Sequence, residues 1–280
     1  LTPQQKAIVN HASGKHARVL AVAGSGKTTT MAYRVKHLLD SKVASADNIL
    51  VIMFNKLARA SFKEKLEEIN IPPAALARVH TFHSYSYKIA NNLIAMGKIL
   101  APTESWTDDA HTEGFSEKVR LTALKAIANL KKVGTIEDDL QVNTDKVINA
   151  ISLYKAYLIS PDKAGYKDKA LHFMPSLYKE FEILRNQANA ITWDDMIPRA
   201  VAILGETQAL GNIEGETITH LIVDEYQDIN YGQQKLIELI AGEIADVMVV
   251  GDDDQTVYEW RGARPDYIIN VYKEAFSNKP

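Results

Sequence analysis

The sequence of 280 residues predicts an α/β protein, in which helices flank an open parallel sheet and a mainly helical subdomain is inserted. Near both ends of the chain, short apolar and β-branched runs alternate with stretches of helical periodicity, and this alternation is typical of parallel sheets. From about 87 to 190 the pattern is helical and contains no buried-strand pattern. We therefore expect the sheet domain to comprise 1–86 and 190–280, and the inserted subdomain to comprise 87–189.

Each predicted strand is short and rich in β-branched residues, which suits a strand buried on both faces of a sheet. Thr2 and Pro3 mark a helix start before the first strand, as N-cap and first helical residue. In chain order, the predicted strands are RVLAV (18–22), NILVIMF (48–54), the start of ARVHTFHS (77–84), HLIVDE (220–225) and DVMVVGDDDQ (246–255). The predicted helices include KTTTMAYRVKHLLDSK (27–42), NKLARASFKEKLEEI (55–69), SEKVRLTALKAIANLKK (116–132) and DKVINAISLYKAYL (145–158). Ligands of such a sheet bind at the carboxyl ends of its strands.

Composition excludes several classes of protein. No apolar run approaches the roughly 20 residues that span a bilayer, and no signal-peptide pattern opens the chain, so we expect a cytoplasmic protein without membrane contact. The absence of cysteine excludes disulfides and thiolate metal sites. The net charge of −3 means that nucleic-acid binding has to come from local basic patches. Because the chain begins at Leu1 inside a motif-like stretch, we also expect a piece of a longer protein.

The stretch RVLAVAGSGKTTT places a glycine-rich turn between a strand and a helix. In such a turn, backbone N–H groups at a helix N-terminus surround a phosphate. Lys27 would reach the β- and γ-phosphates and the Thr28 hydroxyl would bind Mg²⁺. The alternative is an ordinary glycine turn that enters a helix. The residues predicted to bind the nucleotide here are Ala23, Gly24, Ser25, Gly26, Lys27, Thr28 and Thr29.

The stretch LIVDEYQD places two carboxylates at the carboxyl end of a strand. Asp224 would hold Mg²⁺, and Glu225 would orient and deprotonate an attacking water. By itself an acidic pair after a strand is usually a solvated strand end. Together with the glycine-rich loop it indicates hydrolysis of a nucleoside triphosphate, because hydrolysis needs both a metal and a group that activates water.

The stretch VMVVGDDDQTVYEWRGA (247–263) follows the last predicted strand. Gln255 would contact a γ-phosphate that lies between this strand end and the glycine-rich loop. Tyr258 and Trp260 would stack on bases, and Arg261 would contact the phosphate backbone of a nucleic acid. The alternative is that the two aromatic residues belong to the core.

A second candidate nucleic-acid surface is the predicted helix after the second strand. Lys56, Arg59 and Lys63 recur there at helical spacing, which makes either a basic stripe facing DNA or a solvated helix face.

Taken in order, these motifs resemble those of superfamily 1 helicases of the UvrD/Rep/PcrA type, which move 3′→5′ on single-stranded DNA. The segments that carry the resemblance are LTPQQKAIV, AGSGKTTT, MFNKLA, VHTFHS, LIVDEYQDIN and VVGDDDQTVYEWRGA. The resemblance implies a RecA-like P-loop NTPase domain (domain 1A), and the helical segment stands where this family has its inserted subdomain 1B.

The resemblance also implies roles for single residues. Gln5 matches the glutamine that reads the adenine of ATP, and Ala21 matches a small residue that often replaces the first glycine of the loop. Lys27, Thr28, Asp224, Glu225 and Gln255 take the roles given above, with Lys27, Glu225 and Gln255 as catalytic residues. Residues implied to contact DNA are Phe54, Lys56, Thr81, Phe82, His83, Tyr258, Trp260 and Arg261.

Two positions depart from the family pattern. Thr29 stands where many relatives have an arginine that packs on the adenine. Relatives commonly have Thr-Phe-Thr-Asn-Lys-Ala where this chain has Met53-Phe54-Asn55-Lys56-Leu57-Ala58. Either Met53 or Phe54 therefore occupies the place that contacts a base.

The family's second RecA-like domain, which carries the arginine finger and half of the DNA track, has no counterpart in this sequence. We therefore expect the chain, as a monomer, to bind ATP and Mg²⁺ but to hydrolyse ATP slowly without that second domain. In the complete protein we expect hydrolysis to drive movement on single-stranded DNA. The alternatives are another P-loop ATPase of DNA metabolism and a non-catalytic module that binds single-stranded DNA.

Overall fold

The computed structural model describes residues 1–22, 24–107, 116–165, 171–207, 217–252 and 272–276. Five of its strands form one sheet, in which every pairing is parallel and the order is β1-β7-β6-β2-β3. The register sets Val51 opposite both Val79 and Ile222. The bounds are Ala17–Leu20 for β1, Ile49–Met53 for β2, Val79–Thr81 for β3, His220–Val223 for β6 and Asp246–Gly251 for β7. The predicted α/β class is therefore confirmed.

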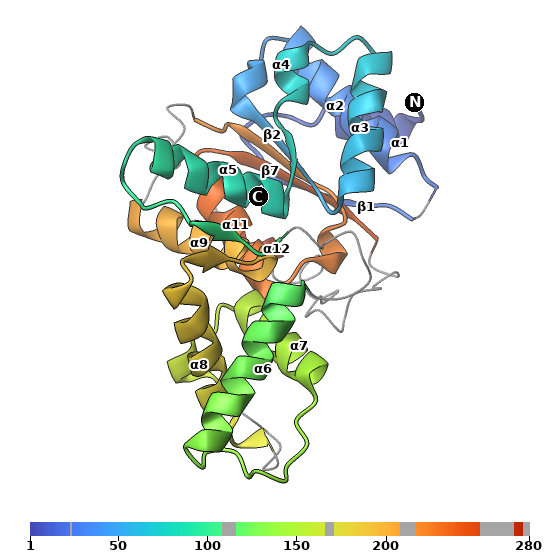
Figure 1. Cartoon of the computed structure of the whole chain (residues 1–280). Helices are drawn as coiled ribbons and strands as arrows, with labels where there is room; N and C mark the ends of the chain where they lie inside the picture. The colour runs from blue at the N-terminus through green and yellow to red at the C-terminus, as the bar shows by residue number, and fades with distance from the viewer. Residues whose placement is uncertain (23, 108–115, 166–170, 208–216, 253–271, 277–280) are drawn as a thin grey trace. The chain divides into compact units, whose positions relative to one another are not determined.

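Helices cover both faces of this sheet. Figure 1 shows α2 and α3 on one face and α5 and α11 on the other. Two of them begin at an asparagine cap: Asn55 caps α3 through a hydrogen bond from Ala58 N (2.8 Å), and Asn230 caps α11 in a reciprocal capping box with Gln233. The helices of this part are α1 (Pro3–Val9), α2 (Lys27–Asp40), α3 (Lys56–Glu68), α4 (Pro73–Leu76), α5 (Phe82–Ala95), α11 (Tyr231–Ala241) and the short α12 (Tyr272–Ala275).

The core follows from the composition of the strands. All five residues of β2 are buried, as expected for a central strand covered on both faces. Alternate strand residues, among them Val51, Ile222 and Met248, pack with α2 and α3 in one hydrophobic cluster. Burial of these side chains is the main favourable contribution to this part of the fold.

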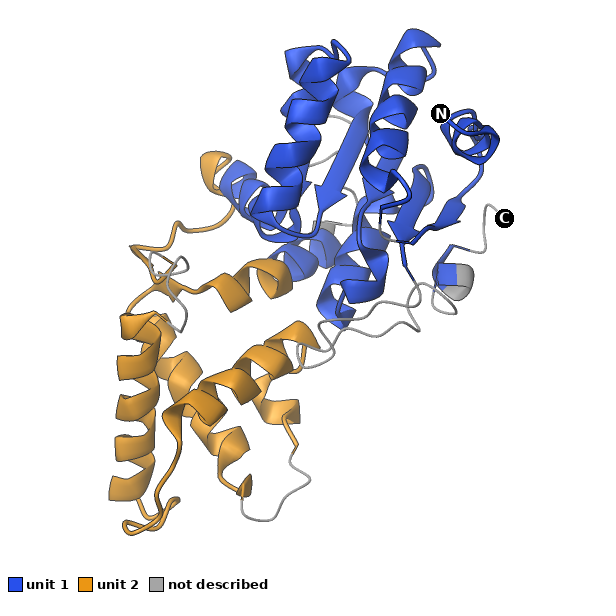
Figure 2. Cartoon of the chain, turned by 90° about the vertical axis from the view of Figure 1, so that its right-hand side faces the viewer, with its two compact units in different colours: residues 1–93, 200–280 blue, residues 94–199 orange. Residues whose placement is uncertain are grey.

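The chain divides into two compact units, which Figure 2 colours separately. Unit 1 comprises 1–93 and 200–280, and unit 2 comprises 94–199. Each has a hydrophobic cluster of its own. Unit 2 contains α6 (Glu117–Lys132), α7 (Thr144–Ala156), α8 (Met174–Gln187), the first half of α9 (Trp193–Thr207) and a two-stranded parallel pairing of β4 (Glu104–Ser105) with β5 (Ala190–Ile191).

The unit boundaries lie inside helices. The first falls within α5 and the second within α9, so no loop marks either one. The boundaries predicted from sequence, at 86/87 and 189/190, precede those of the structure by seven and ten residues. The β4–β5 pairing was not expected, because two residues per strand are too few to form a pattern in the sequence. Among the described residues, no helix is long and apolar enough to cross a membrane.

Candidate active site

The glycine-rich loop joins β1 to α2 at the carboxyl edge of the sheet. Ala21 N donates to Gly251 O (2.9 Å), so the pairing of β1 with β7 continues one residue past the strand. Gly24 and Gly26 then take positive φ angles of 75° and 83°, which L-residues with a side chain rarely adopt. This allows the chain to reverse its direction, and α2 begins at Lys27. The first N–H groups of α2, which have no acceptor within the helix, therefore lie at the loop.

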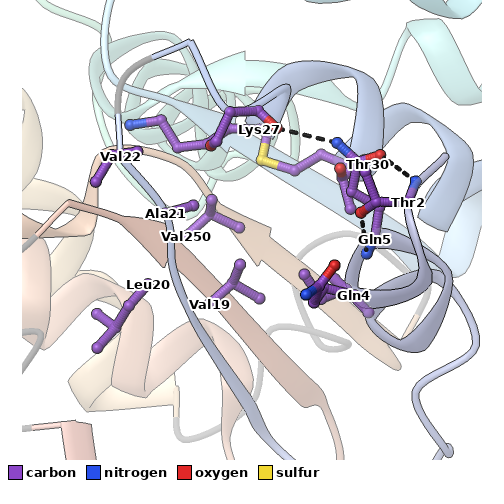
Figure 3. A pocket seen from close by; sticks show the side chains of 13 residues that line it. Thr2, Gln4, Gln5, Val19, Leu20, Ala21, Val22, Lys27, Thr30 and Val250 are labelled. Carbon is purple, nitrogen blue, oxygen red and sulfur yellow. Dashed lines mark hydrogen bonds between the residues drawn. The ribbon is translucent and has the colours of Figure 1, made fainter.

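Gln5 connects α1 to this loop. Its side chain completes a capping box, in which Thr2 N donates to Gln5 Oε1 (2.8 Å) and Gln5 N donates to Thr2 Oγ1 (3.2 Å). Its Nε2 donates to Ser25 O (3.0 Å), which fixes α1 beside the loop (Figure 3). A Cβ at Gly26 would lie 2.8 Å from the same Nε2, so the glycine also leaves room for Gln5.

A cavity of about 390 Å³ opens between α1, the loop and the end of β1 (Figure 3). Its volume lies within the range of about 300–1,000 Å³ that is usual for small-molecule sites. The lining combines apolar side chains with a few polar ones, as in many nucleotide pockets. It comprises Thr2, Gln4, Gln5, Ile8, Val19, Leu20, Ala21, Val22, Ser25, Lys27, Thr30, Met31 and Val250.

The acidic pair follows β6, which lies two strands away from β1 in the same sheet. β6 ends at Val223, and Asp224 N still donates to Ile52 O (3.0 Å). Glu225 adopts a left-handed conformation (φ 49°), which turns the chain out of the sheet into a 3₁₀ turn. Lys27 Nζ then lies 3.2 Å from Glu225 Oε2. Two predicted catalytic residues that are 198 positions apart are thus brought into contact.

Asp224 is 6% exposed, whereas the side chain of Glu225 is 32% exposed. Burial, together with the negative charge of Glu225, raises the pKa of Asp224 to about 7. The carboxyl group of Asp224 is therefore held in a place where its ionised form is costly unless a cation lies next to it.

Gln227, which the sequence analysis did not single out, lies at the centre of this edge. It is 3% exposed. Its Nε2 donates to Glu225 Oε2 (2.8 Å) and to Asp228 Oδ2 (3.3 Å), and its Oε1 accepts from Asp252 N (3.0 Å). Nothing in the local sequence distinguishes this glutamine from a solvated one, because its contact with Asp252 joins it to the end of a different strand.

Met53 and Phe54, the two candidates for contact with a base, differ in their burial. Met53 is the last residue of β2, is 1% exposed and belongs to the core cluster under α2 and α3. Phe54 is half-buried and follows the strand, and Lys56 is exposed at the first turn of α3. Of the two candidates, only Phe54 therefore offers its side chain to a ligand at the surface.

Thr81, Phe82 and His83 span the junction of β3 and α5. Thr81 and Ser84 exchange hydrogen bonds, Thr81 N to Ser84 Oγ (2.8 Å) and Ser84 N to Thr81 Oγ1 (3.2 Å), which caps the helix. Phe82 is 1% exposed, so its ring packs in the core, and His83 is half-buried. At this edge of the sheet the side chain of His83 is therefore partly accessible, whereas the ring of Phe82 fixes the turn by packing in the core.

The remaining predicted site residues lie outside the described part of the chain. They are Ala23 in the loop and Gln255, Tyr258, Trp260 and Arg261 after β7. Thr28 and Thr29 are half-buried in the first turn of α2. Within the described residues, no group of three or more histidine or acidic side chains could hold a metal ion by itself.

Known helicases are similar to this chain over almost its whole length. The chain is 30% identical over 276 residues to the ATP-dependent DNA helicase Rep of Escherichia coli strain K12, which covers 96% of the chain and 38% of that protein. It is 30% identical over 275 residues to the ATP-dependent DNA helicase UvrD1 of Mycobacterium tuberculosis strain H37Rv, covering 94% of the chain and 34% of that protein. The chain thus spans between a third and two fifths of the length of these relatives. The model of the UvrD/REP helicase N-terminal domain matches residues 1–276, and the chain therefore belongs to that family.

Proposed function

We propose that this chain is the ATP-binding motor domain of a helicase that moves 3′→5′ along single-stranded DNA. The observation that carries the proposal is the 3.2 Å contact between Lys27 Nζ and Glu225 Oε2 at the carboxyl edge of the sheet. ATP hydrolysis requires a group that binds the phosphates, a metal ion and a carboxylate that activates water, and this contact joins the proposed first and last of these. The relatives Rep and UvrD1 are named as ATP-dependent DNA helicases, which supports the same function here.

Lys27 is paired with Glu225 in this structure. A bound triphosphate would present more negative charge than one carboxylate, and Lys27 would turn from Glu225 to the β- and γ-phosphates. The N-terminus of α2 would add its N–H groups to the phosphates. Glu225, released from Lys27, would then accept a proton from the attacking water.

Thr28 and Asp224 would hold Mg²⁺. The buried carboxyl group of Asp224, with its raised pKa, fits this role because a neighbouring cation would stabilise its ionised form. Mg²⁺ would supply charge neutralisation at the transferred phosphoryl group. Gln255 would contact the γ-phosphate, and Gln5, which already lies against the loop at Ser25, would bind the adenine.

Single-stranded DNA would cross the same sheet edge on the side of β2 and β3. Phe54 supplies an aromatic face and Lys56 a cation, and His83 lies at the end of the next strand. Burial and the positive charge of the neighbouring Arg59 both lower the pKa of Lys63, which shows that these two basic residues lie close together on α3. Thr81 and Phe82 would shape this track, and Tyr258, Trp260 and Arg261 would stack on bases and bind phosphate.

Efficient turnover would require a second RecA-like domain. An arginine supplied to the phosphates from another domain is worth about 10³–10⁵ in rate in related chemistry. We therefore propose such a domain as the chain's main protein partner, and slow hydrolysis by the 280 residues without it.

The proposal is tested first by titrating the chain with a fluorescent ATP analogue, with and without Mg²⁺. We expect Mg²⁺-dependent binding that Lys27→Ala weakens about 10-fold or more, because a charge-assisted contact to phosphate is lost. Lys36→Ala is the matched control, since Lys36 lies on the same helix and pairs at the surface with Asp40. Equal affinity of the Lys27→Ala variant and the unaltered chain would contradict the site.

The second test measures turnover and DNA binding. We expect a labelled oligonucleotide to bind with an affinity that falls as salt rises, and Phe54→Ala and Lys56→Ala each to weaken it. Rapid ATP hydrolysis stimulated by single-stranded DNA in these 280 residues alone would show that no second domain is needed. Nucleotide binding without any DNA binding would instead favour another P-loop ATPase.

A further inference from the structure

The carboxamide of Gln227 joins two strand ends that flank the nucleotide site. Gln227 lies in the 3₁₀ turn Tyr226–Asp228, directly after β6. Its Nε2 donates to Glu225 Oε2 over 2.8 Å, and its Oε1 accepts from the backbone N–H of Asp252 over 3.0 Å. Because β7 lies between β1 and β6, Asp252 at its end stands between the glycine-rich loop and the acidic pair.

Glu225 Oε2 accepts two hydrogen bonds in this structure, one from Lys27 and one from Gln227. A bound nucleotide would affect the hydrogen bonds from Lys27 and Gln227 differently. A triphosphate competes for Lys27, which is a flexible cation, but not for Gln227, which is 3% exposed and held at its other end by Asp252. The bond from Gln227 is therefore the one that persists on this oxygen when nucleotide occupies the loop.

We propose that Gln227 is a positioning residue that aims the Glu225 carboxylate and couples its orientation to the end of β7. The proposal rests on the ATP-hydrolysing function proposed above. A carboxamide is planar and rigid, so a movement of Nε2 with Glu225 displaces Oε1 and the Asp252 N–H bonded to it. Asp252 is followed in sequence by the stretch from Asp253 to Arg261, which contains the predicted γ-phosphate and base contacts.

A purely structural role for Gln227 would be to satisfy the buried N–H of Asp252. Gln234 provides a matched control, because it is 2% exposed and its carboxamide also makes two side-chain hydrogen bonds, from Tyr226 Oη and to Glu238 Oε1. Gln227→Glu separates the two halves of the contact. In its ionised form it keeps an acceptor for Asp252 N but can no longer donate to Glu225.

The first experiment needs no nucleotide. The amide resonance of Asp252 is recorded by NMR in the full chain, in Lys27→Ala, in Gln227→Leu and in the double variant. We expect Lys27→Ala to shift the Asp252 resonance when Gln227 is present and to leave it unmoved in the Gln227→Leu background. In the Gln234→Leu background the shift should persist. A shift of the same size with and without Gln227 would overturn the proposal, as would no shift in either background.

The second experiment separates binding from chemistry. Hydrolysis of Mg²⁺-ATP is followed under single-turnover conditions with the chain in excess, and the affinity for a non-hydrolysable analogue is measured beside it. We expect Gln227→Glu and Gln227→Leu to lower the rate constant about 10- to 100-fold, as losses of outer partners of a reactive group do, with less than a 2-fold change in affinity. Gln234→Leu should change neither quantity.

Equal loss of rate in the Gln227 and Gln234 variants would show a structural role and overturn the proposal. A flat titration of the unaltered chain with nucleotide would contradict the proposed ATP-binding function instead. In that case the Asp252 resonances still decide whether Gln227 couples the two strand ends.

Discussion

Asp224 and Glu225 are neighbours in sequence and have very different surroundings. Asp224 continues the pairing of β6 with β2 and is buried, whereas Glu225 turns out of the sheet with a positive φ and keeps a third of its side chain exposed. The buried group has a pKa of about 7 because burial and its acidic neighbour both disfavour the ionised form. The proposed metal-binding role and the proposed water-activating role thus fall on two residues joined by one peptide bond.

The raised pKa of Asp224 predicts how stability depends on pH. Protonation of Asp224 stabilises the fold below about pH 4, and this contribution is lost as pH rises through 7, because the folded state binds the proton more tightly than the unfolded state. Asp224→Asn resembles the protonated form at every pH. We expect its free energy of unfolding to exceed that of the unaltered chain by at most about 4 kcal/mol at pH 8 and by little at pH 4.

Urea unfolding at pH 4, 6 and 8 measures this difference. Asp162→Asn is the control, because Asp162 is 81% exposed and its replacement removes one carboxylate without disturbing the core. A constant difference between Asp224→Asn and the unaltered chain across the three pH values would show that Asp224 stays ionised in the fold.

At the scale of single elements, the loop between β1 and α2 depends on two glycines that have different neighbours. Both have positive φ angles, but a Cβ on Gly24 would meet nothing within 4 Å, whereas one on Gly26 would lie 2.8 Å from Gln5 Nε2. At position 24 a glycine is therefore required only by the positive φ angle. At position 26 it is required both by the φ angle and by the close contact with Gln5 of α1.

Gly24→Ala and Gly26→Ala thus form a matched pair. We expect Gly24→Ala to cost roughly 1–2 kcal/mol of stability, which is the strain of an alanine in the left-handed region. Gly26→Ala should cost more and should also weaken binding of the ATP analogue, because it displaces Gln5 from the loop. Thermal unfolding and the fluorescence titration measure the two effects. Identical results for both variants would mean that the contact with Gln5 has no consequence.

Three helices of unit 2 are joined by a group of four charges, of which one, Lys155, is buried and the other three are half-buried. Lys155 Nζ on α7 lies 2.6 Å from Asp195 Oδ1 on α9 and 2.8 Å from Glu182 Oε1 on α8, and Arg185 contacts both carboxylates. Burial by itself lowers the pKa of Lys155, but the two carboxylates outweigh it and hold the pKa above its ordinary value. Such groups favour one specific arrangement of helices, since each charge is costly without its partners.

At the scale of the whole molecule, the two units have separate cores, and every contact of Lys155 given above lies in unit 2. We expect Lys155→Met to destabilise unit 2 by about 3–5 kcal/mol, because two carboxylates lose a buried partner. The affinity of unit 1 for the ATP analogue should change by less than about 2-fold, or under 0.5 kcal/mol. Denaturant unfolding and nucleotide titration of the same variant test both statements.

Lys179→Met is the control, because Lys179 pairs with Asp162 at the surface, where ion pairs contribute about 0–1 kcal/mol. A loss of nucleotide affinity in Lys155→Met would show that the arrangement of helices in unit 2 influences the loop in unit 1.

Much of this molecule follows from its sequence. The short β-branched runs predicted the five strands of the main sheet, because residues buried on both faces leave a continuous apolar pattern. The strand that carries the acidic pair nevertheless ends at Val223, two residues before the predicted end, since Glu225 takes a left-handed conformation. The spacing of Gly24, Gly26 and Lys27 predicted a turn into a helix, and the turn chemistry is local enough to be read from neighbours.

Only the tertiary structure could show which residues from distant segments lie next to one another and which of them are buried. The order β1-β7-β6-β2-β3 sets Asp252 between the loop and the acidic pair, which makes the contacts of Gln227 possible. Burial of Met53 in the core leaves Phe54 as the candidate for contact with a base. The division of the chain within α5 and α9 has no marker in composition. The sequence by itself determined the elements and the chemical groups at their ends, since near neighbours determine periodicity, capping and turns. The structure decided which groups meet, since strand order and burial depend on packing across the whole chain.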